Sequence, residues 1–108
     1  MGNYFTYITT NPKKMVLYTG MTNDLESRII EHFSNRGQRK TFAGRYYCYF
    51  LIYYESFHSP IHAIEREKEI KAMSRKQKNE LISTQNPTFV FLNSQIMKWP
   101  PHPDQTFR

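Results

Sequence analysis

The feature of the sequence that most constrains its fold is an uninterrupted run of aromatic and aliphatic residues at positions 46–54, Tyr-Tyr-Cys-Tyr-Phe-Leu-Ile-Tyr-Tyr. A run of this length without alternating polar residues is typical of a strand that is covered on both faces. We therefore expect a central β-strand here, with Cys48 buried inside the protein.

Two shorter runs nearer the N-terminus predict a β-hairpin. Residues 4–9 and 15–19 are rich in aromatic and β-branched side chains, and the five residues between them, Thr-Asn-Pro-Lys-Lys, have the composition of a turn. Strand alternation places Phe5 and Tyr7 on one face, but only the register of the hairpin decides whether Tyr18 shares that face. Together with the central strand, the hairpin predicts a three-stranded, mainly antiparallel sheet.

Helix-capping signals predict the helices. Asn23, with Glu26 three positions later, predicts the N-cap and the capping-box acid of a helix over 23–33. A Ser-Pro pair opens a second helix over 59–73, and a serine followed three positions later by a glutamine opens a third over 74–83. The predicted fold class is therefore α+β, a small single domain in which three or more helices flank the sheet.

Three segments give weaker signals. Residues 34–45 contain four cations and two glycines without a clear period, which predicts a flexible basic loop. Residues 89–92 fit either a short strand or coil. Residues 93–108 include the proline-rich stretch Trp-Pro-Pro-His-Pro, so we expect a domain over 1–92 followed by an irregular, proline-containing tail over 93–108.

The charge balance favours a polyanionic partner. The chain has 15 Lys and Arg against 9 Asp and Glu, a net charge of +6. Such an excess is typical of domains that bind nucleic acid, although charge alone is weak evidence.

Three features of the sequence bear on the compartment. A single cysteine cannot form an intramolecular disulfide, the N-terminus lacks the pattern of a signal peptide, and no apolar run approaches the roughly 20 residues that span a bilayer. We therefore expect a cytoplasmic protein with no membrane partner.

One acidic residue occupies an unexpected place in the second helix. At 100° per residue, Glu67 lies between Ala63, Ile64 and Ile70 on the apolar stripe. A carboxylate in that position needs an ion pair, a hydrogen bond or a bound cation. The residues alone leave two explanations open, an ion pair at the edge of the stripe and a metal-binding or catalytic role.

Two other pairs also have both a structural and a functional explanation. Arg28 and His32 are four residues apart and so lie on one helix face, which is usually a solvated face. Tyr7 and Tyr18 have the ordinary explanation of cross-strand aromatic packing. Their order along the chain, rather than any one pair, points to a shared site.

In order, the chain presents Phe5-Thr6-Tyr7, Tyr18-Thr19-Gly20, Arg28 with His32, and then Glu67, and in this it resembles the GIY-YIG nuclease family. The first motif keeps the last tyrosine of Gly-Ile-Tyr, and the second keeps the tyrosine and glycine of Tyr-Ile-Gly. The likeness is to small stand-alone bacterial members, which resemble the N-terminal catalytic domain of an excision-repair nuclease. It covers roughly residues 4–87, with matching motifs at 18–20, 22–28, 67–71 and 75–78.

The resemblance implies a role for each of these residues. Glu67 would bind Mg²⁺ or Mn²⁺, Arg28 would contact the reacting phosphate, and Tyr7 or Tyr18 would help to activate water. His32 would be an auxiliary acid-base or phosphate-binding group. A further family position at Lys40 and Thr41 implies contact with the phosphate backbone, and the full set of expected nucleic-acid contacts is Arg36, Arg39, Lys40, Thr41, Arg45 and Lys71.

The implied activity is a metal-dependent endonuclease that hydrolyses phosphodiester bonds, with DNA more strongly expected than RNA and with no small-molecule cofactor. One carboxylate is enough to hold Mg²⁺ when waters and a substrate phosphate complete the coordination shell. An ordinary phenol is ionised only about one part in a thousand at pH 7, which costs about 4 kcal/mol. The tyrosine therefore acts either with a depressed pKa or as a proton relay, and the sequence leaves both open.

Two other functions compete with the nuclease. In the first, the fold is a non-catalytic module whose basic loop and Lys71, Arg75, Lys76 and Lys78 bind phosphates. In the second, the aromatic surface serves a structural or protein-interaction role, which the positive charge disfavours. Because no zinc finger or helix-turn-helix is apparent, target specificity is expected to be structural or weak, or to come from a protein partner.

Overall fold

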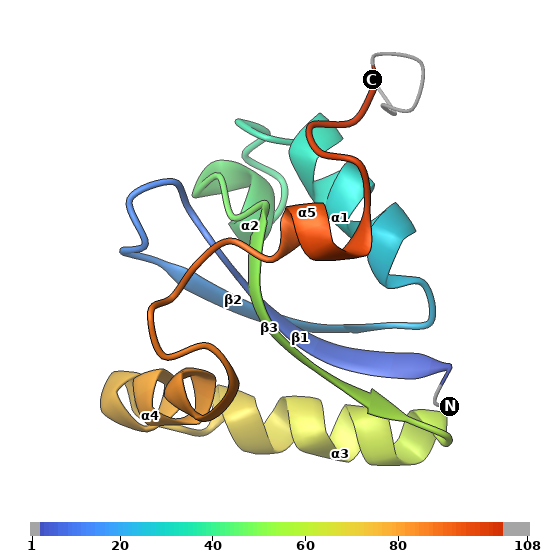
Figure 1. The fold of residues 1–108 in the computed structure, drawn as a ribbon, viewed down its shortest axis with the longest axis vertical. Coiled ribbons are helices and arrows are strands. Elements are labelled where there is room, and N and C mark those ends of the chain that lie inside the picture. The colour runs from blue at the N-terminus through green and yellow to red at the C-terminus, as the bar shows by residue number, and fades with distance from the viewer. Residues whose placement is uncertain (1–2, 103–108) are drawn as a thin grey trace.

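The computed structural model describes residues 3–102 and contains one three-stranded antiparallel sheet (Figure 1). The strands are β1 (Tyr4–Thr10), β2 (Leu17–Thr22) and β3 (Phe50–Phe57), in the order β2-β1-β3. The α+β class and the N-terminal hairpin are thus confirmed. The prediction that the aromatic run forms the central strand is wrong, because β1 is central and β3 lies beside it.

Side chains from the C-terminal part of the chain explain why β3 has the composition of a central strand. The Asn93 side chain accepts a hydrogen bond from the Leu51 backbone N–H at 2.7 Å and donates to the Tyr49 carbonyl at 3.0 Å. Asn86 Nδ2 donates to the Ile52 carbonyl at 2.9 Å. These amides take the place of a fourth strand at the start of β3, so this part of the strand is covered on its outer edge as well as on its faces.

The first half of the aromatic run is not a strand. Residues 46 and 47 form a turn after a short helix, residues 48 and 49 have no regular structure, and Tyr47 has a positive φ of 60°. Cys48 is only 1% exposed, which confirms its predicted burial. The strand begins at Phe50, where pairing with Thr10 of β1 starts.

Helices cover both faces of the sheet (Figure 1). The helices α1 (Leu25–Ser34), α2 (Phe42–Arg45) and α5 (Asn93–Ile96) lie on one side, and α3 (Pro60–Lys71) and α4 (Arg75–Gln85) lie on the other. The core is correspondingly double: Tyr7, Leu25, Ile29 and Leu51 pack on the α1 face, whereas Ile8, Ile52, Tyr53, Ile70 and Ile82 pack on the α3 face.

The capping signals are confirmed for two helices and displaced by one residue for the third. Ser59 caps α3, and Ser74 with Gln77 forms the predicted capping box of α4. The N-cap of α1 is Asp24 rather than Asn23, since Asp24 Oδ1 accepts from the Ser27 backbone N–H at 3.0 Å. Asn and Asp cap helices equally well, so only the end of β2 at residue 22 distinguishes the two.

The basic segment 34–45 is more ordered than the predicted flexible loop. Thr41 Oγ1 accepts a hydrogen bond from the Gly44 N–H and caps α2, and the Gly37 N–H donates to the Gly44 carbonyl at 2.8 Å. A Cβ on Gly44 would lie 2.6 Å from the Gln38 carbonyl oxygen, so close backbone packing requires this glycine. These contacts order the backbone that carries the cations of the segment.

The C-terminal segment packs back onto the α1 face. Residues 89–92 are coil, the second of the two expected alternatives. The Trp99 ring lies 5.0 Å from that of Phe33 and 5.9 Å from that of Phe50, between centroids. The described part of the expected tail, residues 93–102, therefore packs against the domain. Residues 103–108 lie outside the described residues.

Candidate active site

The register of the hairpin brings the two motif tyrosines onto one face. Tyr7 of β1 pairs with Gly20 of β2, and Tyr18 pairs with Thr9. Tyr7 and Thr9 are two positions apart on β1 and therefore share a face, and a residue directly opposite Thr9 shares that face as well. Both tyrosines thus point toward α1, with ring centroids 6.3 Å apart. The structure thus resolves the register that the sequence left open.

Gly20 provides the space for the Tyr7 ring. A Cβ at this position would lie 2.4 Å from the Tyr7 hydroxyl oxygen and 2.6 Å from Cζ. Tyr7 is itself 0% exposed, so its ring has no free volume into which to move. The glycine of the second motif is therefore needed because a tyrosine stands opposite it.

Replacing Gly20 with alanine is expected to lower the free energy of unfolding by about 1–3 kcal/mol, the usual cost of overpacking a core. Urea denaturation measures this. The matched control is the same change in a Tyr7→Leu background, where the three atoms nearest to a Gly20 Cβ have been removed. An equal cost in both backgrounds would show that the two residues are not coupled.

His32 joins the tyrosines from α1. The Tyr7 hydroxyl is 2.8 Å from His32 Nε2, and the His32 ring meets the Tyr18 ring edge-on, with centroids 5.4 Å apart. Arg28, one turn earlier on the same helix face, is close enough for its positive charge to act on the pKa of Tyr7, and it forms an ion pair with Glu31 at 3.7 Å. Tyr7, Tyr18, Arg28 and His32 thus form one cluster, called here the tyrosine–histidine cluster.

Burial sets the protonation states in this cluster. It raises the pKa of Tyr7 well above the ordinary value, and Tyr18 adds to the rise, whereas the Arg28 guanidinium opposes it. Burial, with the positive charge of Arg28, lowers the pKa of His32 to about 4. At neutral pH the phenol of Tyr7 is protonated and His32 is neutral, so Tyr7 can donate its proton in a hydrogen bond to Nε2.

The stability of the protein is expected to fall as the pH is lowered from about 6.5 to about 4, the ordinary and the folded-state pKa of His32. In this window the unfolded chain takes up a proton that the folded chain does not, which costs up to about 3 kcal/mol. Chemical denaturation across the pH range tests this. His32→Gln should reduce the dependence, whereas a change at the exposed His62 should leave it intact.

Glu67 belongs to α3, the helix that covers the other face of the sheet. Its side chain is 21% exposed, and its carboxylate pairs with Lys71 Nζ at 3.3 Å. Its stripe neighbours Ala63 and Ile70 are fully buried, but Ile64 is 39% exposed, so Glu67 stands at the edge of the stripe. The ion pair that the sequence left open as an explanation is therefore present.

The residues present fit a divalent metal only as a single-carboxylate site. Within residues 3–102 there is no group of three or more His, Cys, Asp or Glu side chains that could hold a metal ion. Mg²⁺ commonly keeps several waters and binds through one or two carboxylates plus substrate phosphates. Glu67, half-buried but reached by solvent, has the donor chemistry for such a site.

The expected nucleic-acid contacts divide into two groups. Arg36 Nη1 donates to the Phe33 carbonyl at 2.6 Å and its guanidinium stacks on the Phe33 ring, while Thr41 caps α2. These two side chains support the local fold. The other members, namely Arg39, Lys40, Arg45 and Lys71, are exposed.

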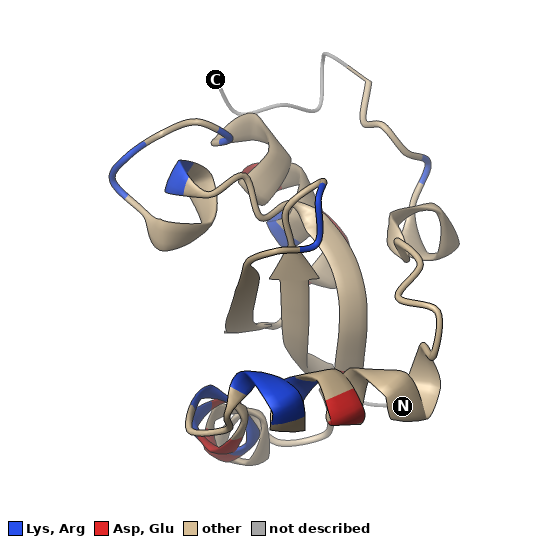
Figure 2. Cartoon of the chain, turned by 90° about the vertical axis from the view of Figure 1, so that its left-hand side faces the viewer, with Lys and Arg blue, Asp and Glu red and all other residues tan. Residues whose placement is uncertain are grey.

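Lys and Arg cluster at two ends of the face seen in Figure 2, on the segment around α2 and along α3 and α4. The loop of the hairpin joins the second group, because Arg75 donates to the carbonyls of Met15 and Lys14. A cavity of about 610 Å³ at the first group is lined by Gly37, Arg39, Arg45 and Tyr47. Sequence reasoning found these cations but missed the aromatic residue among them.

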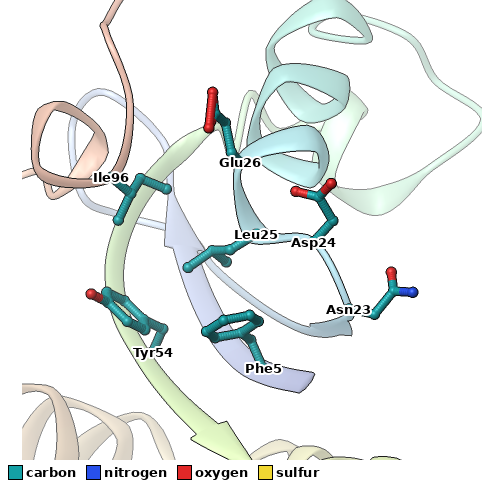
Figure 3. Close-up of a pocket in the computed structure, with 7 residues that line it drawn as sticks. All are labelled: Phe5, Asn23, Asp24, Leu25, Glu26, Tyr54 and Ile96. Carbon is teal, nitrogen blue, oxygen red and sulfur yellow. The ribbon is translucent and has the colours of Figure 1, made fainter. Parts of the chain in front are cut away.

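A second cavity lies on the α1 face near the start of the helix (Figure 3). It measures about 420 Å³ and has an apolar floor that includes Phe5, Leu25 and Tyr54. Asp24 and Glu26 stand at its rim and carry negative charge, which makes this cavity unsuited to a phosphate (Figure 3). The basic cavity is the one whose charge suits nucleic acid.

Comparison with known proteins shows the family to which the chain belongs. Residues 3–80 match the GIY-YIG catalytic domain, and the chain therefore belongs to the GIY-YIG family, a family of nucleases. Its relatives include UPF0213 proteins of Staphylococcus saprophyticus and Staphylococcus haemolyticus, which are 40% and 39% identical over 77% and 76% of this chain and over 98% and 96% of their own lengths. A UPF0213 protein of Clostridium perfringens is 43% identical over 65% of this chain and 73% of its own.

The family membership confirms the resemblance stated from the motifs. It implies a nucleic-acid substrate and a general dependence on a divalent metal. No solved structure gives a significant match to the chain. In the part of the chain that is described, no helix is both long and apolar enough to cross a bilayer.

Proposed function

We propose that this protein is a metal-dependent endonuclease that hydrolyses phosphodiester bonds in nucleic acid, with DNA as the preferred substrate. The observation that carries the proposal is the hydrogen bond between the buried Tyr7 and His32, with Arg28 and Tyr18 directly beside it. Phosphodiester hydrolysis needs an activated nucleophile and stabilisation of the charge that develops on the phosphoryl group, and this cluster offers phenols and an imidazole for the first and a permanent cation for the second.

The burial of the two tyrosines supports different roles for them. Tyr7 is fully buried and its hydroxyl is engaged with His32, so it positions the imidazole. Tyr18 is partly exposed and can meet the attacking water. His32 is neutral because its pKa is about 4, so it serves as the hydrogen-bond acceptor for Tyr7 rather than as the final proton acceptor, and the tyrosine hydroxyls can relay a proton.

Arg28 and Glu67 complete the proposed machinery. The Arg28 side chain is 36% exposed, and its forked guanidinium suits the oxygens of the reacting phosphate. Glu67 would hold Mg²⁺ or Mn²⁺ once its ion pair with Lys71 opens. The bound metal would supply Lewis-acid stabilisation of the charge that develops on the phosphate.

Cleavage of labelled single-stranded, duplex and branched DNA and RNA, with Mg²⁺, with Mn²⁺ and with EDTA, tests the proposal. We expect cleavage with either metal and none with EDTA. Tyr18→Phe should lower the rate more than Tyr7→Phe, because Tyr7 acts through His32. Salt-sensitive binding without cleavage of any substrate would instead support the alternative, a non-catalytic nucleic-acid-binding module on the same fold.

A further inference from the structure

Three large aromatic side chains are exposed between residues 42 and 47, at the end of the basic segment. Phe42 is 49% exposed, Tyr46 42% and Tyr47 48%. The other large hydrophobic side chains exposed in the described chain are aliphatic or methionine: Met15, Ile61, Ile64 and Val90. Aromatic exposure is therefore concentrated around α2 and does not recur elsewhere on the described surface.

The aromatic side chains are held in place and lead into the tyrosine–histidine cluster. The rings of Phe42 and Tyr46 have centroids 4.8 Å apart. Phe42 also stacks on Tyr18, at 6.2 Å and with 25° between the planes. Tyr18, Phe42 and Tyr46 thus form a continuous row from the candidate active site to the outer surface of α2.

Positive charge is interleaved with this row. Arg39, Lys40 and Arg45 are exposed, and the Arg45 guanidinium is anchored by a hydrogen bond to the Arg39 carbonyl at 3.0 Å. The basic cavity of about 610 Å³ lies between Arg39, Arg45 and Tyr47. The sequence has no Asp or Glu between Glu31 and Glu55, so no carboxylate of this segment opposes a phosphate.

We propose that residues 39–47 bind unpaired nucleotides, whose bases stack on Phe42 and Tyr46 while Arg39 and Arg45 hold the phosphates. The inference rests on the proposed nuclease function and names its substrate class, namely single-stranded DNA or the unpaired part of a branched DNA. Exposed aromatic rings in a cationic groove suit bases of any sequence, because every base has a face on which to stack. In a duplex those faces are already stacked, and extruding a base costs a few kcal/mol.

Binding measured without cleavage tests this inference separately from the nuclease activity. Fluorescence anisotropy in EDTA would compare a labelled 12-nucleotide single strand, the same strand with abasic sites throughout, and a duplex of the same length. The abasic strand keeps the phosphates and lacks the bases. We expect the single strand to bind more tightly than either of the others.

Two variants remove the stacking surface without removing charge. Phe42→Ala and Tyr46→Ala should each weaken binding of the single strand by roughly 5- to 150-fold, the effect of losing one stacked base, and should leave binding of the abasic strand unchanged. Tyr46→Ala is the cleaner variant because Tyr46 is not paired with Tyr18. Val90→Ala, an exposed apolar residue outside the row, is the control and should change nothing.

Arg45→Ala provides the complementary variant, and it should weaken binding of all three DNAs and reduce the salt dependence. Equal binding of the single strand and the abasic strand, with no effect of Tyr46→Ala, would overturn the inference even if the protein cleaves DNA. Tighter binding of the duplex would overturn it as well. Base-dependent binding without any cleavage would uphold the stacking surface while the proposed nuclease activity fails.

Discussion

Replacing Arg28 with alanine is expected to lower the rate of metal-dependent cleavage by about 10²–10³-fold, the usual cost of removing one group that stabilises developing charge. Arg28 is the permanent cation of the tyrosine–histidine cluster and is partly exposed. Single-turnover cleavage of a labelled strand measures the effect. Because a lysine lacks the planar fork, Arg28→Lys should recover little of the rate.

Glu31→Ala is the matched control for Arg28, because it removes the ion-pair partner and leaves the guanidinium in place. An exposed pair of this kind contributes little stability, so both variants should stay folded. A rate that is unchanged in Arg28→Ala would exclude this residue from the chemistry. An equal loss in Glu31→Ala would show that the orientation of the arginine, rather than its charge, is what matters.

Replacing Glu67 with alanine is expected to abolish cleavage in Mg²⁺ and Mn²⁺ while leaving DNA affinity nearly unchanged. Glu67 has the donor chemistry of a single-carboxylate metal site, and its only recorded partner in residues 3–102 is Lys71. Glu67→Gln should behave in the same way, since a neutral amide is a weak ligand for Mg²⁺. Cleavage rates measure the activity, and fluorescence anisotropy with the same DNA measures the affinity, so the two effects are determined separately.

Glu65, exposed on the same helix, provides the control for this variant, and Glu65→Ala should cleave normally. Circular dichroism is needed as well, because loss of a partly buried charge partner can destabilise a fold. An unfolded Glu67→Ala protein would assign the residue a structural role. A folded variant that still cleaves at the wild-type rate would remove Glu67 from the metal site.

Much of the candidate cluster could be predicted because it depends on local periodicity. The spacing of four residues puts Arg28 and His32 on one helix face, and strand alternation puts Tyr7 on the face opposite to Ile8. The structure adds the register of the hairpin, in which Tyr7 of β1 pairs with Gly20 of β2. The sequence pattern of either strand alone does not contain this register, because it depends on which residue of the partner strand leaves room for the tyrosine ring.

The errors have a common physical cause, which is that the ordering contacts are specific hydrogen bonds and close packing that leave no periodic pattern in the sequence. The run at 46–54 has the composition of a central strand, yet the neighbour on its outer side is a set of amides from Asn86 and Asn93. The segment 34–45 has no regular period, yet a cap at Thr41 and a close backbone contact at Gly44 order it. Periodicity along the sequence does not show such contacts, and the Asn93–Tyr49 contact joins residues 44 positions apart.

The amides on β3 also have a consequence for how the protein avoids self-association. An unprotected edge strand offers free N–H and C=O groups to any other extended chain and so invites aggregation. Asn86 and Asn93 occupy such groups at Tyr49, Leu51 and Ile52, and they do so with side chains that cannot extend the sheet further. The match to the catalytic domain stops at residue 80, so it is the chain beyond this match that occupies the outer edge at the start of β3 and keeps another strand from pairing there.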